Sequence, residues 1–415
     1  MEELKLIPEI RFPEFEEPLA ALKLGDIAKF SKGKGISKAD IVVDGEIECV
    51  RYGELYTHYN EIIEDVLSKT NLPLDELVLS EKNDVIIPAS GETELDIATA
   101  SCVLKSGIAL SSDLNIIKSS ANGVFLAYYL NNAKKLDIAK LSQGISVVHL
   151  YGSQLKTLKL NLPIIEEQQK IATFLTSIDE RIQLLEKKKE SLEDYKKGIM
   201  QKIFSQEIRF KDEDGNDYPE WEEKKLGDIG YFQTSSVNKL SNKDEKEVYL
   251  VNYMNVYRHE DINNISKKGF QIVTAKDSQI ETSNLLKGDI LFTPSSETPD
   301  DIGHSAVIFE DLDNTVFSYH LIRFRPVMKL NLLYSHYFCN IPSVARQLSR
   351  FATGSTRFTI SLGNFSKVKI HIPHYNEQQK IASFLSSIDD SIEQVTQQIE
   401  HSKTYKKGLL QKMFV

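Results

Sequence analysis

The chain has 415 residues, 41% of them hydrophobic, which is enough to form two or more domains with cores of their own. No apolar run approaches the length that spans a bilayer, and the first ten residues lack a secretory pattern, so neither a membrane nor a secreted protein is expected. The three cysteines are scattered and form no C-x-x-C pair, which favours a reducing cytoplasm.

The net charge of −10 is distributed unevenly. Residues 1–20 contain six acids and two bases, and residues 207–223 contain eight acids and two bases, so these segments carry the whole acidic excess. Residues 314–376 contain no acid but eight Lys and Arg, and residues 97–165 carry seven Lys against two Asp. A polyanion responds to a local basic face more than to the total charge. The pattern favours an anion-binding face in each half over cations that merely solvate a surface.

In chain order, residues 1–20 form an N-terminal segment, and a first globular domain follows at 21–160. Short β-rich stretches at 46–50 and 85–88, bounded by Gly, Ser, Asn and Asp, and a helix at 124–136 predict an α+β fold for this domain.

A long spacer helix is predicted within the next segment, 161–206. From Ile171 to Ile203, the seam positions recur every four and three residues without a break, a period of about 3.5 that is typical of a coiled coil. Pro163 is expected to end the strand that precedes the helix.

An acidic linker at 207–223 leads to a second α+β domain at 224–370. Residues 371–415 repeat the spacer helix with the same spacing. Packing the two helices against each other would bury both seams, with self-association of whole chains as the alternative. The elements predicted for the second domain are strands at 290–293, 306–309 and 321–325 and a helix at 333–348.

The second half of the chain repeats the first, which indicates a pseudo-two-fold internal repeat. Residues 166–175 and 376–385 are identical at eight of ten positions. We therefore expect two globular domains separated by a pair of long antiparallel coiled-coil helices, with N-terminal residues 1–20 closing the repeat beside the C-terminus. The repeated motifs are EQQKIA at 167–172 and 377–382, LGDI at 24–27 and 226–229, and EIRF at 9–12 and 207–210.

Two variable domains, each followed by a P-x-x-E-Q-x-K-I-A helix, resemble the specificity (S) subunit of a Type I restriction–modification system. Further matching motifs are YKKG at 195–198 and 405–408 and SSET at 295–298. The resemblance covers essentially the whole chain. It implies that each domain is a target-recognition domain that reads one part of a split double-stranded DNA site, and that the paired helices set the spacer between the parts.

The same resemblance implies the partners. Two copies of a methyltransferase (M) subunit would hold S-adenosylmethionine and methylate adenine, and a restriction (R) subunit would use ATP and Mg for cleavage. The specificity subunit would have no cofactor of its own and would work in a prokaryotic cytoplasm. A coiled-coil adaptor with two protein-binding domains is the alternative, which the acid-free segment makes less favourable.

Motifs for catalysis do not assemble in the sequence. It contains no D/N-P-P-Y/F motif for adenine methylation and no GxxxxGK[ST] loop for a motor. The Pro299-Asp300-Asp301 turn lacks the E-x-K partner of a nuclease, and His371 and His374 lack a third metal ligand. No catalytic and no metal-binding residues are therefore predicted.

Candidate DNA contacts are basic, amide, hydroxyl and aromatic side chains, because cations neutralise phosphates and Arg, Asn and Gln pair with base edges. The basic residues are expected on phosphates more than on bases, and Gly354 is expected to let the chain approach the groove closely. In the first domain the candidates are Arg51, Tyr52, Tyr56, His58, Tyr59, Lys140, Gln143, Ser146 and His149. In the second domain they are Asn252, Tyr253, Asn255, Tyr257, Arg258, Arg346, Arg350, Gly354, Ser355, Thr356 and Arg357.

The EQQK stretches are the candidate dock for the methyltransferase, because an exposed flank duplicated within the chain suits two identical partners. Helix capping and packing shared by both halves is the alternative reading. The residues concerned are Glu167, Gln168, Gln169, Lys170, Glu377, Gln378, Gln379 and Lys380.

Overall fold

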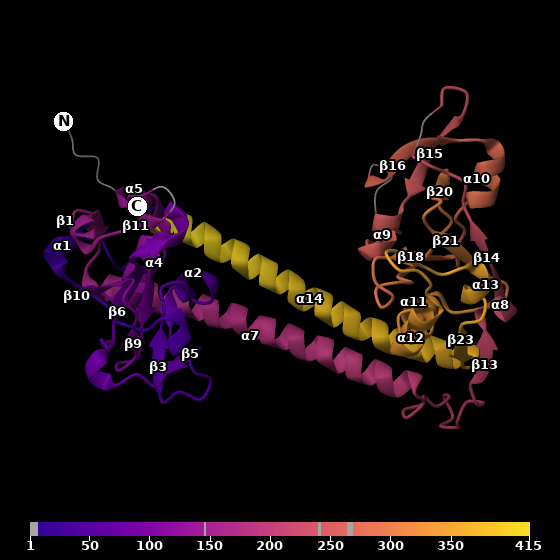
Figure 1. Cartoon of the computed structure of the whole chain (residues 1–415), viewed down its shortest axis with the longest axis horizontal. Coiled ribbons are helices and arrows are strands. Elements are labelled where there is room, and N and C mark those ends of the chain that lie inside the picture. The colour runs from indigo at the N-terminus through magenta and orange to yellow at the C-terminus, as the bar shows by residue number, and fades with distance from the viewer. Residues whose placement is uncertain (1–6, 145–146, 240–241, 264–268) are drawn as a thin grey trace. The chain divides into compact units, whose positions relative to one another are not determined.

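The structure confirms the α+β class (Figure 1). Small sheets of short strands alternate with short helices, and two helices of 40 and 39 residues, α7 (Ile165–Phe204) and α14 (Tyr375–Met413), follow the sheet-rich regions. The computed structural model describes residues 7–144, 147–239, 242–263 and 269–415.

The chain divides into two compact units. The first unit joins residues 1–187 to residues 397–415, and the second unit consists of residues 188–396. Helices α7 and α14 are therefore each divided between the two units.

The first unit is built on a five-stranded sheet with the strand order β2-β10-β6-β8-β4. Every residue of the central strand β6 is buried, as its apolar, β-branched sequence favours. A three-stranded sheet, β5-β3-β9, pairs β3 antiparallel with β5 and parallel with β9. The strands are β1 (Ala20–Lys23), β2 (Ala28–Lys32), β3 (Ile47–Val50), β4 (Ile62–Ile63), β5 (Ser68–Thr70), β6 (Asp84–Pro88), β7 (Ser90–Gly91), β8 (Ser101–Val103), β9 (Ala109–Leu110), β10 (Leu114–Ser119), β11 (Val148–His149) and β12 (Lys159–Leu162).

The second unit repeats this plan with a four-stranded sheet, β14-β21-β17-β19, and a three-stranded sheet, β16-β15-β20. Strand β15 again pairs antiparallel on one side and parallel on the other. The strands are β13 (Glu222–Lys225), β14 (Gly230–Thr234), β15 (Lys246–Val251), β16 (Gln271–Ala275), β17 (Ile290–Phe292), β18 (Ser295–Ser296), β19 (Ser305–Val307), β20 (Thr315–Phe317), β21 (Ile322–Pro326), β22 (Phe358–Thr359) and β23 (Lys369–Ile372).

Short helices cover the sheets and connect the strands. In the first unit they are α1 (Leu24–Ile27), α2 (Glu54–Thr57), α3 (Glu94–Ile97), α4 (Gly123–Asn132), α5 (Lys135–Leu141) and α6 (Gly152–Leu155), with 3-10 turns η1 (Lys38–Asp40) and η2 (Leu74–Glu76). In the second unit they are α8 (Leu226–Ile229), α9 (Tyr253–Tyr257), α10 (Asp277–Ser283), α11 (Leu332–Phe338), α12 (Pro342–Phe351) and α13 (Leu362–Phe365).

The main core of each unit is formed by one sheet, a buried helix and parts of both long helices. In the first unit, α4 is apolar on nearly every side and packs with Ile171 and Leu175 of α7 and Leu409 and Met413 of α14. In the second unit, α11 and α12 pack with the late part of α7 and the early part of α14. The apolar residues that recur along α7 and α14 therefore pack into the core of the unit to which they belong.

Ion pairs give the direction of the helix pairing inside each unit. In the first unit, Lys403 of α14 pairs with Glu186 of α7, and Lys406 pairs with Asp179, both at 2.7 Å. Later residues of α14 therefore meet earlier residues of α7, which confirms the antiparallel arrangement. The equivalent pair in the second unit joins Lys196 to Asp389.

Equivalent turns confirm the internal repeat. Asn83 and Gly288 both have positive φ, at 79° and 94°, in the turn that precedes the central strand. The next residue accepts a backbone hydrogen bond at 2.8 Å in both halves, Asp84 from Glu81 N and Asp289 from Leu286 N. Lys82-Asn83-Asp84 and Lys287-Gly288-Asp289 therefore form the same capped turn in the two halves.

The EIRF segments close both units in the same way. Ile10 N donates to Lys412 O at 3.0 Å in the first unit, and Ile208 N donates to Lys202 O at 3.2 Å in the second. The last residue, Val415, also accepts from the Tyr129 hydroxyl at 3.1 Å. The N-terminal segment therefore lies beside the C-terminal end of α14, as expected from the EIRF repeat at 9–12 and 207–210.

Several element boundaries differ from the sequence prediction. The single helix expected at 333–348 is two helices, α11 and α12, because Pro342 lacks an N–H and starts a new helix at its first turn. The helix expected at 124–136 ends at Asn132 and is followed by α5. The strand expected at 306–309 is β19, one residue earlier and shorter.

Candidate nucleic-acid interface

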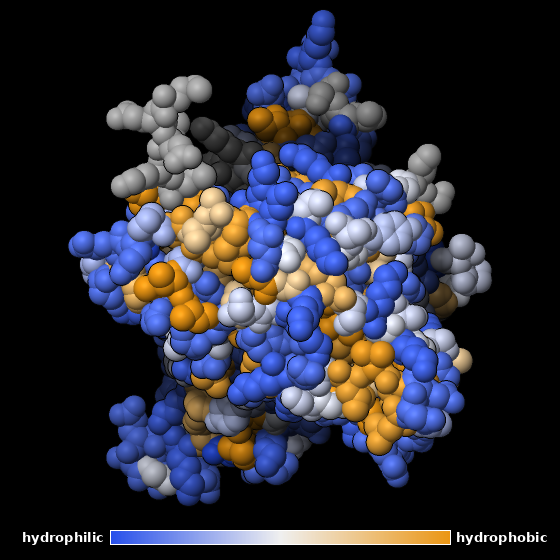
Figure 2. All heavy atoms as spheres, turned by 90° about the vertical axis from the view of Figure 1, so that its left-hand side faces the viewer, coloured by the Kyte–Doolittle hydropathy of each residue, from blue (hydrophilic) through white to orange (hydrophobic). Residues whose placement is uncertain are grey.

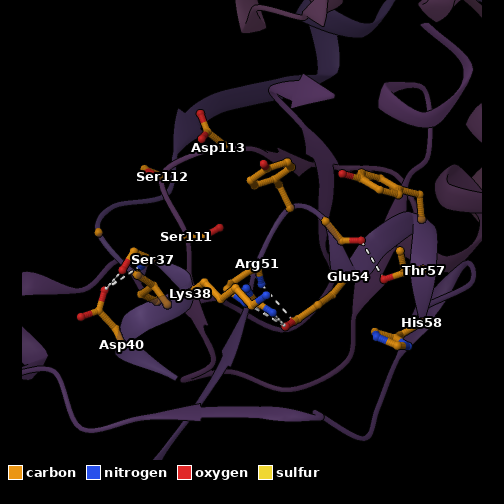
Figure 3. Close-up of a pocket in the computed structure, with 15 residues that line it drawn as sticks. Ser37, Lys38, Asp40, Arg51, Glu54, Thr57, His58, Ser111, Ser112 and Asp113 are labelled. Atoms are coloured by element: carbon orange, nitrogen blue, oxygen red, sulfur yellow. Dashed lines mark hydrogen bonds and ion pairs between the residues drawn. The ribbon is translucent and has the colours of Figure 1, made fainter. Parts of the chain in front are cut away.

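A pocket of about 730 Å³ lies beside β3 and α2 of the first domain (Figure 3). It contains four of the predicted DNA contacts, Arg51, Tyr52, Tyr56 and His58. Figure 3 shows Ser37 and Asp40 on one side of it and Glu54, Thr57 and His58 on the other. The residues that line the pocket are Gly35, Ile36, Ser37, Lys38, Asp40, Arg51, Tyr52, Gly53, Glu54, Tyr56, Thr57, His58, Ser111, Ser112 and Asp113.

Glu54 fixes the position of Arg51. The carboxylate of Glu54 is 4% exposed and accepts from Arg51 Nε at 3.0 Å, from the backbone N of Arg51 at 3.1 Å and from Ser68 Oγ at 2.6 Å. A buried carboxylate with this many donors is satisfied and stays in place. The sequence reasoning missed Glu54, although its position three residues after Arg51 at the start of a helix is typical of a cap.

The tyrosines of the first cluster have different roles. Tyr52 and Tyr56 line the pocket. Burial raises the pKa of the Tyr59 phenol, whose oxygen accepts from Leu67 N at 2.9 Å and whose ring packs against buried apolar residues. Tyr59 therefore holds the loop that follows α2 and does not line the pocket.

The other predicted stretch of the first domain forms a closed loop. Gln143 and His149 exchange two backbone hydrogen bonds, at 2.9 and 2.7 Å, and β11 pairs with β7. The exposed ring of His149 stacks on Tyr151, and Lys140 is exposed on α5. Ser146 lies outside the described residues.

In the second domain the two predicted clusters meet at Ser295 of β18. The Tyr253 hydroxyl donates to Ser295 O at 2.7 Å, and Arg357 Nη2 donates to Ser295 Oγ at 3.3 Å. Residues more than a hundred positions apart in the sequence thus form one surface.

Two asparagines of this surface serve the backbone. Asn255 is 9% exposed; its Oδ1 accepts from Asn252 N at 2.9 Å and its Nδ2 donates to Glu260. The interpretation of Asn255 as a base contact is therefore wrong, because its polar atoms already cap α9 and bind within the domain. Asn252 is half-buried and uses Oδ1 to accept from Met254 N at 3.0 Å.

A polar network beside α9 was not foreseen. The Tyr257 hydroxyl donates to Asp301 Oδ2 at 2.8 Å, and the other oxygen of Asp301 lies 2.8 Å from His304 Nε2. His304 Nδ1 lies 3.1 Å from His259 Nε2. Burial would raise the pKa of Asp301, but the hydrogen bonds from His304 and Tyr257 outweigh it and lower that pKa. Asp301, read as a plain turn residue in the sequence, thus anchors one predicted contact, Tyr257.

The remaining basic candidates are exposed. Arg346 and Arg350 lie on α12, Arg258 follows α9, and Arg357 lies with Ser355 and Thr356 in the loop before β22. In the described parts of the chain, Arg258, Arg346 and Arg350 form no ion pair. They are available to an anion.

Gly354 has a structural role within its own loop. Its φ is +147°, and a Cβ added there would lie 2.0 Å from Arg357 O, within its own loop. Gly144 has the same geometry in the first domain, with φ +134° and a distance of 2.0 Å to Val147 O. Both glycines are therefore required by the backbone of the loop in which they lie, and the approach of Gly354 to a DNA groove stays a prediction.

Part of the acid-free basic run is internal. Arg323 is 2% exposed and donates to Gln233 Oε1 and to Asn284, while Arg325 binds both oxygens of the buried Asp289 at 2.6 and 2.7 Å. These two arginines stabilise the sheet of the second unit and do not contribute to a surface.

The predicted methyltransferase dock is half wrong. Glu167, Gln168, Glu377 and Gln378 are 0–5% exposed. The two glutamates bind the EIRF arginines: Arg11 reaches Glu167 at 2.8 and 2.7 Å, and Arg209 reaches Glu377 at 2.9 and 3.0 Å.

The two glutamines clasp the neighbouring helix. Gln168 Oε1 accepts from Asn122 N, and Gln378 Oε1 accepts from Asn331 N, both at 3.0 Å. Each glutamine also donates to the carbonyl of the proline five residues earlier, Pro163 or Pro373. The alternative reading, shared capping and packing, fits these four residues because their polar side-chain atoms bind partners within the chain.

The other four dock candidates remain at the surface. Gln169, Lys170 and Gln379 are exposed, and Lys380 is half-exposed. Lys170 pairs with Glu14, and Lys380 donates to Lys211 O at 2.7 Å. Figure 2 shows that the visible face of the first unit is mostly hydrophilic with small separate apolar patches.

The described residues contain no group of three His, Cys, Asp or Glu side chains that could hold a metal ion. Burial raises the pKa of the Cys49 thiol to about 11 and that of Cys102 to about 12, so both stay protonated at neutral pH. Over the same residues, no helix is long and apolar enough to cross a bilayer.

Comparison with known proteins decides the family. Residues 17–194 and 218–401 both match the family described as Type I restriction modification DNA specificity domain. The chain belongs to this family. It carries two specificity domains, and each match includes one globular domain and most of the spacer helix after it.

Relatives of this specificity-domain chain match along its whole length. The Type I restriction enzyme MjaVIII specificity subunit of Methanocaldococcus jannaschii is 26% identical, over 99% of this chain and 94% of the relative. The crystal structure of a Type I restriction–modification S subunit from M. genitalium superposes with a TM-score of 0.59 at 16% identity, covering 99% of both chains. A chain from a study of complex assembly and conformational transition of the type I R-M system gives 0.57 at 15% identity, covering 96% of this chain and 97% of that one.

Proposed function

We propose that this chain is the DNA-reading subunit of a Type I restriction–modification complex and that its two domains bind separate parts of one double-stranded target. The observation that carries the proposal is that the two domains share the same backbone elements but carry different side chains at equivalent positions. The strand, short helix and closed loop recur in both domains, yet Arg51 stands where the second domain has Asn252, and Val147 where it has Arg357. One frame with two different sets of donors suits two different base sequences.

Affinity would come from the exposed cations and sequence choice from the residues beside them. Arg346 and Arg350 on α12 and Arg258 after α9 suit phosphates, because they have no carboxylate partner among the described residues. Arg357 lies next to the Tyr253 surface and suits a base edge.

The chain itself would catalyse nothing. Two methyltransferase subunits would carry S-adenosylmethionine, and a restriction subunit would bring ATP and Mg, in a prokaryotic cytoplasm. The surface pairs Gln169–Lys170 and Gln379–Lys380, of which Lys380 is half-exposed, flank the two equivalent helix starts and would give two like docking points.

The experiment is to express the chain with a methyltransferase subunit of the same restriction–modification system and to measure binding and methylation. The complex should bind DNA with a strong salt dependence and should methylate adenine in a split motif that sequencing of the host genome reveals. The Arg346→Ala/Arg350→Ala double variant should reduce the salt slope by about two, since each phosphate contact contributes about 0.9. Lys276→Ala, an exposed cation at the start of α10, is the matched control and should change little. Absence of any methylated motif or sequence preference in the complex would overturn the proposal.

A further inference from the structure

We propose that the pocket of the first domain reads the edge of a guanine, with Arg51 as the reading side chain and Glu54 as the residue that positions it. The inference rests on the proposed function, since it assumes that this domain faces its DNA target. It adds which base is read, by which atoms, and why the equivalent position of the second domain does not read the same base in the same way.

The geometry leaves the useful side of the guanidinium free. Arg51 uses Nε and Nη2 to bind one oxygen of Glu54, at 3.0 and 2.9 Å. A guanidinium has five N–H donors, of which Glu54 takes two. The remaining donors include one on each terminal nitrogen, and this pair matches the O6 and N7 acceptors of guanine. Glu54 thus orients the Arg51 fork before DNA arrives.

The charges in the pocket favour a base over a phosphate. Glu54 neutralises Arg51, and two further carboxylates, Asp40 and Asp113, line the same pocket against one further cation, Lys38. A phosphate brought here would meet three carboxylates, whereas the edge of a base pair is uncharged and presents an amino group as well as acceptors. Arg51 therefore acts as a directional donor rather than as a free cation.

Ser111 supplies a second group that lacks a partner. It lines the pocket, is 2% exposed, and its Oγ has no hydrogen-bond partner within the described residues. Buried hydroxyls are nearly always satisfied, so an orphaned one beside the pocket is unusual, and a small movement of its side chain would let it reach a bound group. The loop that faces it is bent by Gly35 and Ile36, both at positive φ, and a β-branched residue there is strained.

The second domain provides the comparison. Asn255 occupies the position of Glu54 and accepts from Asn252 N, as Glu54 accepts from Arg51 N. Asn252, at the position of Arg51, uses its oxygen to cap α9 and offers only its amide N–H groups. The second domain therefore presents no guanidinium fork at the position equivalent to Arg51, although Ser318, its equivalent of Ser111, also has an unpartnered hydroxyl.

The test is to compare methylated motifs after expression with the methyltransferase subunit. Arg51→Ala alone leaves Glu54 buried without its partner and risks misfolding. The Arg51→Asn/Glu54→Asn double variant avoids this, because it installs the pair that already folds at 252 and 255. Arg51→Lys is the second variant, since it keeps the charge but loses the fork. Glu54→Gln tests positioning, and Lys276→Ala is the control.

The wild-type motif should contain a G·C pair in the half read by the first domain. The double variant and Arg51→Lys should reduce discrimination at that one position by about 10- to 100-fold, leaving the other half-site unchanged. Glu54→Gln should relax the same position to a smaller extent. Relaxation at a different base, in the other half-site, or at no position would overturn the inference. A complex that methylates no motif at all would instead refute the proposed function.

Discussion

Arg11 donates from Nε and Nη2 to both oxygens of Glu167, at 2.8 and 2.7 Å, and so joins the N-terminal segment to the first turn of α7. Arg209 and Glu377 repeat the contact in the second unit, where Trp221 Nε1 adds a third donor to the same carboxylate at 3.1 Å. The hydrogen bond to Glu167 raises the pKa of Arg11, and the hydrogen bond to Glu377 raises the pKa of Arg209. The two arginine–glutamate pairs have the same geometry. In the first unit the arginine comes from the N-terminal segment, and in the second unit it comes from the segment that follows α7.

Glu377→Gln should destabilise the second unit by roughly 3 kcal/mol, because the amide nitrogen would face donors and Arg209 would keep only the exposed Glu220, at 3.6 Å, as a counter-charge. Glu167→Gln should do the same to the first unit, to a smaller extent since it lacks the indole donor. Thermal unfolding of the full chain measures the loss of stability in each variant. Glu166→Gln, at an exposed neighbouring position, should shift the midpoint very little. Equal, small effects at 166, 167 and 377 would contradict the stabilising role of the two arginine–glutamate pairs.

A circular permutant that links Val415 to Ile7 and opens the chain after Gln206 should fold. The N-terminal segment already hydrogen-bonds to the last turn of α14, so a short linker suffices, and Gln206 lies in the exposed turn after α7. Circular dichroism and the unfolding midpoint should match the parent. Opening the chain inside α4 is the negative control, since α4 is buried. Failure of the first permutant to fold would show that the end contacts are not sufficient.

Gly144→Ala and Gly354→Ala should each disturb one closed loop and weaken reading of one half-site. Both glycines have positive φ and a neighbouring carbonyl oxygen where the new Cβ would be, so the cost should be on the order of 1–3 kcal/mol and local. Methylation of each half-site by the complex reports the effect. Gly198→Ala and Gly408→Ala are matched controls, because these helical positions have open space and Ala should stabilise by about 0.5–1 kcal/mol.

The second unit should lose stability as the pH falls below about 6.5, the ordinary pKa of histidine. Burial, and then Lys196, lower the pKa of His336 in the folded state. A histidine with a lowered folded pKa is neutral in both states at high pH, but in acid the unfolded state binds the proton first, so unfolding is favoured. Comparing unfolding midpoints at pH 7.5 and 5.5 tests this. His336→Asn should flatten the dependence, and an unchanged slope in that variant would assign the effect elsewhere.

The fold was largely predictable because duplication shows itself in sequence. The EIRF motif at both 9–12 and 207–210 correctly placed the N-terminal segment beside the end of α14. The seam spacing predicted both long helices, since a heptad-like period depends only on local sequence. The break at Pro342 was missed because the apolar spacing continues across it.

The burial of Glu167 and Gln168 was also within reach of the sequence. Each lies four residues before a buried seam residue, Ile171 or Ala172, and so on the same face of α7. A carboxylate on a buried face needs an internal cation, and the EIRF arginine is the one that both halves provide.

Other parts of the site depend on contacts that no local pattern encodes. Arg323 lies in a strand within the acid-free run, and its burial follows from Gln233, Asn284 and Asp289, which come from distant elements. The network of Asp301, His304 and His259 likewise forms only when two loops fold together.

The two units differ in how much of the chain each needs. The second unit is one continuous stretch, whereas the first needs residues 397–415 to complete its core. On the ribosome, the half that is translated first must therefore wait with part of its apolar surface uncovered until the final turns of α14 emerge. The half translated second can finish folding before it.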